Sequence, residues 1–245
     1  MQHEILKISI SMKRYTKAVS VIILIMSVIY ASGCKKYYWS GEGGFITLDV
    51  SGNIGGYEYV DLGLPSGLLW ATCNVGARTP EKDGESFAWG GIWTGGGCFD
   101  WDCYHYCMGS KNTLTKYCNE ASNGYNGYTD DLTILISEDD AAAVNWGSGW
   151  RMPTIEEWEE LIEHIPYKRT GINGVDGILF TSSNGNMLFL PGLNNGEYHY
   201  WSSSLDTESP LCALDFEIEY DYAHVWSWCR YHYLSIRAVH SALQN

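Results

Sequence analysis

The side chains best suited to chemistry or binding in this sequence are concentrated between residues 91 and 130. This stretch holds four cysteines, Cys98, Cys103, Cys107 and Cys118, with His105 among them. Thiolate and imidazole groups could hold zinc, but the spacing lacks the paired C-x2-C elements of structural zinc sites. Disulfides are the favoured interpretation, because the N-terminal sequence indicates export to an oxidising compartment.

The same stretch is rich in aromatic rings separated by Gly and Asn. It presents seven candidate ligand-binding rings: Trp93, Phe99, Trp101, Tyr104, Tyr106, Tyr125 and Tyr128. Aromatic faces stack on the apolar faces of sugars, while Asp, Asn and Glu hydrogen-bond to hydroxyl groups. Individual rings in such a loop often pack against one another. As a group they predict a binding surface on a long loop, and Trp226 with Trp228 would add a second aromatic surface.

The first 34 residues indicate export. Lys13, Arg14 and Lys17 precede the apolar run Ala18–Ala31, which at 14 residues is short for a membrane span and typical of a signal peptide. The run ends in Ala-Ser-Gly-Cys34, which resembles a bacterial lipoprotein lipobox with Ala31 in place of the usual Leu. We therefore expect Cys34 to be lipidated and the protein to be anchored in the cell envelope, at the outer membrane. An ordinary cleaved secretory signal is the alternative.

The assignment of Cys34 to lipidation leaves the other cysteines outside the signal segment to be interpreted. Cys212 lies in LCALDFEIEY (211–220) and Cys229 in VWSWCRYHYLSIRAV (225–239), two strand-like segments whose antiparallel pairing would bring the thiols together. These two cysteines are therefore a candidate disulfide pair. Seven cysteines remain after Cys34, so we expect one free thiol, at Cys73 in an apolar strand-like segment.

The mature chain is strongly acidic. Residues 1–34 hold four of the 15 basic and one of the 29 acidic side chains, which leaves a formal charge of −17 over 211 residues. Such a surface repels phosphate backbones, so we expect no nucleic-acid partner.

Periodicity and capping signals predict an α+β domain. Thr154 and Glu157 form a T-x-x-E capping box before an apolar stripe that continues to Ile165. Ser137 is expected to cap a shorter helix over 138–145. Short strands are expected on both sides of the Leu64–Gly67 turn, around the Asn184-Gly185 hairpin signal and toward the C-terminus. Residues 35–55 are interpreted as a tether, and 56–245 as one domain with an insertion at about 91–130.

Six ordered blocks carry a family resemblance: residues 59–77, 87–90, 139–161, 185–192, 200–204 and 235–239. They resemble the Fibrobacter major paralogous domain family, which is abundant among exported lipoproteins of Bacteroidetes-type bacteria. RMPTIEEWE (151–159) is also similar to an element of the formylglycine-generating-enzyme and C-type-lectin-like superfamily. The resemblance implies a C-type-lectin-like fold: two helices, a twisted antiparallel sheet and long functional loops. It also implies structural roles for Arg151 and the SIRAV segment.

We expect no cofactor, although a calcium ion is a further possibility to consider. Asp100, Asp102, Asp130 and Asp131 supply oxygen ligands near the insertion. The sugar-site signatures of C-type lectins, E-P-N or Q-P-D with W-N-D, are absent, and so is EF-hand spacing. Acidic clusters on an acidic protein are usually solvated surface.

The expected function is a non-catalytic binding or adhesion module with a glycan or surface-protein ligand. Enzymes related to the formylglycine-generating enzyme use cysteine pairs or histidine-held metal on late loops. Cys212, His224, Cys229 and His232 lie in the corresponding region, so a thiol or metal enzyme is one alternative. However, no H-x3-E, G-x-S-x-G, phosphate-loop or H-E-x-x-H motif is present. A structural component of an envelope assembly is the other alternative.

Overall fold

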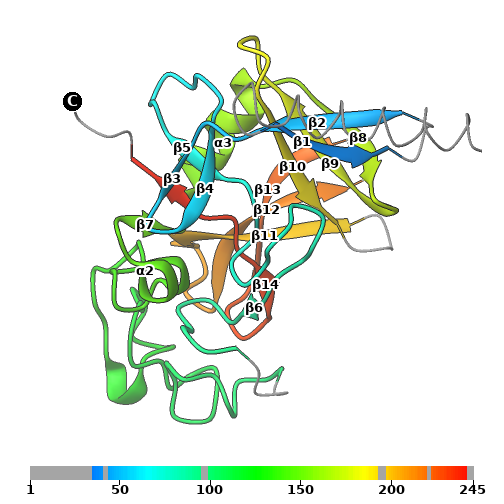
Figure 1. The fold of residues 1–245 in the computed structure, drawn as a ribbon. Coiled ribbons are helices and arrows are strands. Elements are labelled where there is room, and N and C mark those ends of the chain that lie inside the picture. Colours follow the sequence, from blue (N-terminus) through cyan, green and yellow to red (C-terminus); the bar gives the residue numbers. More distant parts are fainter. Residues whose placement is uncertain (1–34, 41–43, 95–98, 193–196, 220–221, 242–245) are drawn as a thin grey trace, which may run out of the picture.

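The computed structural model describes residues 35–40, 44–94, 99–192, 197–219 and 222–241. The domain is α+β and mostly β-strand, with two α-helices and three sheets of three or more strands (Figure 1). Within these ranges, neither helix has the length and apolar character needed to cross a bilayer. The signal segment and Cys34 lie outside the described residues.

Helix α3 (Ile155–His164) begins where the capping box predicts. The Thr154 side chain accepts from the Glu157 amide, and the Glu157 carboxylate accepts from the Thr154 amide at 2.9 Å. Arg151 donates to both carboxylate oxygens of Glu157 at 2.6 and 2.5 Å. The capping box is therefore confirmed, and Arg151 holds its glutamate in place.

Helix α2 (Ala141–Trp146) differs from its prediction, because Asp140 and not Ser137 is the N-cap. Asp140 Oδ1 accepts from the amides of Ala142 and Ala143, and Oδ2 accepts from the Met152 amide at 2.8 Å. A carboxylate satisfies three backbone donors at once, which a single serine hydroxyl does not do. This tertiary contact to Met152 selects the later start.

The central sheet has the strand order β13-β12-β11-β14-β6 and packs against α3. Its strands are β6 (Ser86–Phe87), β11 (Glu197–Leu205), β12 (Cys212–Glu219), β13 (Tyr222–Cys229) and β14 (Leu234–Ser235). Trp158 of α3 is fully buried and stacks on Phe216 of β12 with ring centroids 4.4 Å apart. This contact places the helix over one face of the sheet and leaves the other face for other side chains.

A second five-stranded sheet joins distant parts of the chain in the order β3-β4-β5-β15-β7. It comprises β3 (Gly52–Ile54), β4 (Tyr57–Asp61), β5 (Leu69–Ala71), β7 (Trp150–Arg151) and β15 (Val239–His240). The predicted Leu64–Gly67 turn links β4 to β5, with the Gly67 amide 2.9 Å from the Leu64 carbonyl. Buried Arg237 donates to Asn74 Oδ1 and to the carbonyls of Ala71 and Phe189. The SIRAV segment thus ties the C-terminus to two sheets.

A third sheet has the order β10-β9-β8, with β8 (Tyr167–Ile172), β9 (Val175–Thr181) and β10 (Met187–Pro191). The Asn184-Gly185 signal correctly predicts the β9–β10 hairpin, and Gly185 takes φ +90° in its turn. Strand β8 was not expected from the sequence. It forms because Tyr167–Ile172 pairs along its whole length with β9.

The expected tether at 35–55 is wrong. Its residues form the hairpin of β1 (Lys35–Trp39) and β2 (Phe45–Asp49), followed by β3. Tyr38 and Leu48 are buried against Ile172, Leu179 and Phe189 of the third sheet. Alternating side chains on the paired strands create this apolar inner face, which the glycine and serine punctuation of the segment concealed.

Candidate functional site

The insertion is a largely irregular loop that forms the lower part of the molecule in Figure 1. Buried Arg230, next to β13, makes four hydrogen bonds, three of which anchor the insertion. Its guanidinium donates to Tyr104 Oη and to the carbonyls of Lys116, Tyr117 and Pro210 at 2.7–3.1 Å. The loop is therefore positioned by one cation held against backbone dipoles.

Three of the seven candidate rings pack within the insertion. Tyr104 is 4% exposed and donates to the Trp89 carbonyl at 2.8 Å, so it is a core residue in this structure. Trp101 packs edge-on against Tyr104 and Tyr231, and Tyr106 packs against Tyr117. These contacts form because Arg230 draws the tyrosines toward the sheet.

The other four rings remain on the surface. Trp93 is 80% exposed and Phe99 63% exposed, while Tyr125 and Tyr128 are 44% and 38% exposed. Phe99 makes an edge contact with Tyr233, with centroids 5.3 Å apart. Tyr128 donates to Asp130 at 2.8 Å. The insertion thus offers separate exposed rings around a packed centre.

Of the three described cysteines of the insertion, two are free thiols, against the expected disulfides, and one is disulfide-bonded. Cys107 and Cys118 are free thiols, which donate to the carbonyls of Trp101 at 2.8 Å and Glu120 at 3.1 Å. Each thiol points at a carbonyl of its own loop, so the two do not meet. Cys103 is disulfide-bonded, and Cys98 lies outside the described residues. Cys73 is a free thiol, but it is one of five among the described residues, so the expectation of a single free thiol is wrong.

Cys212 and Cys229 lie directly opposite each other on β12 and β13, so their predicted antiparallel pairing is confirmed. The neighbouring pair carries the cross-strand hydrogen bond, from the Arg230 amide to the Leu211 carbonyl at 3.1 Å. The cysteines therefore occupy a non-hydrogen-bonded position, where Cα atoms lie about 4.5 Å apart. Both are free thiols in the structure, and burial together with Cys229 raises the pKa of Cys212 to about 11.

Oxidation is expected to join Cys212 to Cys229, because their separation lies within the range that disulfides accept. Treatment with oxidised glutathione should remove two hydrogens and protect both from alkylation, while Cys73 still reacts with N-ethylmaleimide. The closed loop should raise the unfolding free energy by ~2 kcal/mol. Cys212→Ser is the control that should show neither change. Alkylation of both cysteines in the oxidised wild type would contradict this pairing.

The face of the central sheet away from α3 carries the strongest cluster of polar and aromatic groups. We call it the ladder face. Its residues are His199 on β11, Asp215 and Glu217 on β12, and His224, Trp226 and Trp228 on β13. Intervening residues such as Phe216 and Ile218 point to the helix side. Side chains alternate along each strand, so one side of the sheet is apolar and buried and the other side is polar.

A row of three side chains crosses the ladder face. His199 pairs in register with Glu217, which pairs with His224. The Glu217 carboxylate lies 3.7 Å from His199 Nε2 and 3.5 Å from His224 Nε2. It thus lies between two imidazoles, an arrangement that can accept and donate hydrogen bonds to hydroxyl groups.

Fully buried Asp215, two residues before Glu217 on the same side of β12, supports this row. Its Oδ2 lies 3.0 Å from His199 Nδ1, while its Oδ1 has no hydrogen-bond partner in the described part of the chain. Burial raises the pKa of Asp215, and the hydrogen bond from His199 opposes that shift. Nδ1–H donation to Asp215 leaves Nε2 of His199 directed at Glu217.

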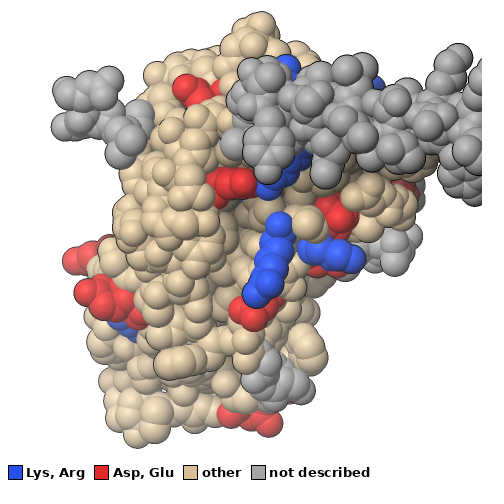
Figure 2. Space-filling model, in the orientation of Figure 1, with Lys and Arg blue, Asp and Glu red and all other residues tan. Residues whose placement is uncertain are grey.

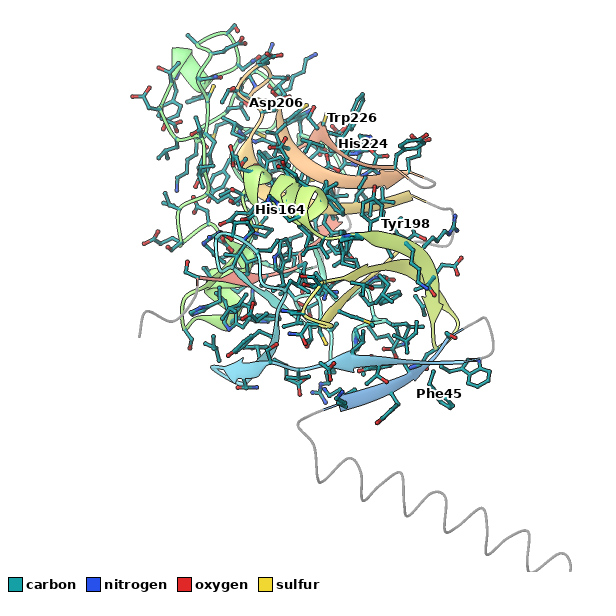
Figure 3. The ribbon with its side chains drawn as sticks, turned by 90° about the horizontal axis from the view of Figure 1, so that it is seen from above. Phe45, His164, Tyr198, Asp206, His224 and Trp226 are labelled. Carbon is teal, nitrogen blue, oxygen red and sulfur yellow. The ribbon has the colours of Figure 1, made fainter. Side chains whose placement is uncertain are left out.

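Exposed aromatic rings border the row. Trp226 is 56% exposed, with its ring 6.2 Å from that of His224 (Figure 3). Trp228 packs between His199 and His232, and its Nε1 is buried without a partner among the described residues. Tyr222, on the same face, is 77% exposed. The edge strand β13 thus presents three aromatic rings and one imidazole at alternate positions.

A cleft of about 290 Å³ adjoins the ladder face at His199. Its polar lining includes Asp83, Ser86, Tyr233 and Ser235. Tyr233 also contacts Phe99, so one exposed ring of the insertion packs against a residue that lines the cleft. Carboxylate, imidazole and hydroxyl groups therefore surround a space at the lower end of the range of ligand sites.

Two of the four acidic residues considered for calcium, Asp100 and Asp130, accept hydrogen bonds from backbone amides. Asp130 accepts from the amides of Tyr117, Cys118 and Leu132, and Asp100 accepts from the Trp101 amide. Among the described residues, no group of three or more His, Cys, Asp or Glu is placed to hold a metal ion. The Asp100 and Asp130 carboxylates therefore stabilise the backbone of the insertion.

Sequence reasoning missed His199, Asp215 and Glu217. The signal that could have found them is the alternation in LCALDFEIEY, where Asp215 and Glu217 lie between apolar residues. His199 could not be placed beside them without the strand pairing. Comparisons of the chain with family models, curated proteins and solved structures found no match.

Proposed function

We propose that this protein is an exported, lipid-anchored, non-catalytic binding module that recognises glycans through the ladder face. The anchor at Cys34, the C-type-lectin-like architecture and the membership of the Fibrobacter major paralogous family belong to this proposal. The observation that carries it is exposed Trp226 on the same sheet face as the His199–Glu217–His224 row.

The chemistry of the ladder face suits a sugar. The face of an indole packs on the C–H surface of a pyranose, while a carboxylate and imidazoles accept and donate hydrogen bonds to its hydroxyls. Trp226 supplies the first contact and Glu217 with His224 the second. The cleft beside His199 extends the surface to further hydroxyl-binding groups.

Charge agrees with a neutral ligand better than with a polyanion. On the face drawn in Figure 2, Lys and Arg lie beside Asp and Glu, and most of the surface is uncharged. Among the described residues, this side of β11, β12 and β13 carries the carboxylates of Asp215, Glu217 and Glu219 and no Lys or Arg. Nucleic acids and highly sulfated polymers are therefore disfavoured partners.

Trp226→Ala is expected to weaken glycan binding at least ~10-fold, the effect of losing about 1.4 kcal/mol at an aromatic contact. The measurement is binding of the purified protein to an oligosaccharide array, followed by titration of the best sugar. Trp93→Ala is the matched control, because Trp93 is also an exposed tryptophan, at 80% against 56% for Trp226, but lies in the insertion.

The control should bind like the wild type. Loss of binding in Trp93→Ala with full binding in Trp226→Ala would move the site to the insertion. A wild-type protein that binds no member of the array would contradict a glycan ligand and favour a protein partner.

A further inference from the structure

We propose that the outward face of the β1–β2 hairpin rests on the lipid surface and sets the orientation of the domain. This inference rests on the proposed lipid anchor at Cys34. The segment was expected to be a tether, yet it is a folded part of the domain that begins at the next residue, Lys35.

The outward face of the hairpin is aromatic. Tyr37 is 43% exposed, Trp39 50% and Phe45 70%. Tyr37 and Trp39 alternate along β1 and share one side of it, and Trp39 pairs in register with Phe45. The rings of Trp39 and Phe45 meet edge to face with centroids 5.3 Å apart. Three large rings thus form one exposed apolar strip.

The opposite face of the hairpin is fixed to the domain. Tyr38 and Leu48 are buried against the third sheet. The Asn173 amide donates to the Trp39 carbonyl at 2.8 Å, and Asn173 Oδ1 accepts from the Trp39 amide at 3.2 Å. The aromatic strip therefore cannot turn inward without breaking a buried contact, and its direction is a property of the whole domain.

The position of the strip next to Cys34 identifies a lipid surface as its occupant. Five strand residues span roughly 17 Å, which is the chain length from Cys34 to Trp39, and Phe45 lies directly across from Trp39 on the paired strand. Tethering over so short a distance gives the strip a millimolar or higher effective concentration of lipid. Trp and Tyr favour the membrane–water interface, where their apolar rings and polar atoms are both accommodated. Lys35 lies on the same face, but its ammonium group is 3.7 Å from the Asp49 carboxylate, so the rings and not a net positive charge carry the argument.

The position of the hairpin on the lipid surface would determine the direction in which the ladder face points. Phe45 lies at one end of the molecule, and Trp226 and His224 lie at the other (Figure 3). A hairpin resting on the membrane would therefore present the ladder face away from the lipid, where a large ligand can reach it.

Lipidated full-length protein in phosphatidylethanolamine–phosphatidylglycerol vesicles tests the seating. Tryptophan emission is recorded with and without bromine on the acyl chains, for the wild type, Trp39→Phe and Trp226→Phe. The difference between wild type and each variant reports one indole. We expect the Trp39 signal to be strongly quenched by brominated lipid and the Trp226 signal to be unaffected. Equal quenching of the two signals would overturn the proposal.

The anchor is tested separately by incorporation of an alkyne-labelled fatty acid in cells. Wild type should be labelled and sediment with membranes, and Cys34→Ala should be unlabelled and soluble. An unlabelled wild type would overturn the anchor and the seating together. A labelled wild type whose Trp39 is not quenched would overturn the seating alone. Trp39→Phe conserves an aromatic ring, and its unfolding midpoint should equal that of the wild type.

Discussion

Replacing Arg230 with Met is expected to release the insertion from the central sheet and to lower the unfolding free energy by ~3 kcal/mol or more. The guanidinium is fully buried and donates to Tyr104 Oη and to three backbone carbonyls. Methionine fills part of the volume but donates no hydrogen bond. Its substitution would therefore leave buried acceptors without partners, each at a cost of ~1–3 kcal/mol.

Chemical denaturation measures the loss of stability, and hydrogen–deuterium exchange locates it. Exchange should rise most between residues 99 and 130, where Arg230 holds Tyr117 and its neighbours. Arg169→Met is the matched control, because Arg169 is exposed and pairs with Asp176 only at 3.4 Å. That substitution should cost no more than ~0.5 kcal/mol. Similar losses in the two variants would contradict the anchoring role of Arg230.

Trp158→Ala is expected to cost ~3–5 kcal/mol, the range for removing a large aromatic side chain from a core. Trp158 has no exposed surface and stacks on Phe216 at 4.4 Å, with Trp70 at 4.6 Å on another side. The loss would open a cavity between α3 and the central sheet, since Phe216, Trp70 and the third neighbour, Tyr200, cannot collapse into the space without moving strands.

The unfolding free energy of Trp158→Ala can be compared with that of Glu163→Ala on the same helix. Glu163 is exposed, so its truncation should change stability by less than ~0.5 kcal/mol. A small loss in Trp158→Ala would show that α3 is not held by this contact. The proposed ladder face would then lack a rigid support, because α3 packs on the same strands from behind.

Rigidity of the central sheet is what qualifies the ladder face as a binding surface. His199, Glu217 and His224 come from three strands whose register is fixed by the burial of Phe216 and Ile218 on the helix side. A shift of one residue would bury Glu217 and expose the apolar neighbours. The positions of His199, Glu217 and His224 are therefore set by the packing of Phe216 and Ile218 on the opposite side of the sheet.

Local signals predicted several elements well. The capping box at Thr154 and the Asn184-Gly185 turn depend on residues only a few positions apart, so their chemistry can be recognised in the chain itself. The pairing of Cys212 with Cys229 also followed from two recognisable strand patterns. The start of α2 was misplaced because its cap, Asp140, is selected partly by the distant Met152 amide.

The candidate site was largely hidden from sequence reasoning. The rings of the insertion are close in sequence, and this predicts one aromatic surface. In the structure, Tyr104 is buried beside Arg230 while other rings of the insertion stay exposed. His199 and Glu217 are 18 positions apart and meet only through antiparallel pairing. The hairpin at 35–49 was mistaken for a tether, because the surface that makes it fold belongs to the third sheet.

The sequence by itself determined the helix start at Thr154, the main turns, the α+β composition and the acidic surface. Each of these depends on local backbone chemistry or on simple counts. Only the tertiary structure decided which aromatic rings are exposed, which thiols face each other without a bond, and which imidazoles share a carboxylate. Those properties depend on strand register and burial, which arise from contacts between residues far apart in the chain.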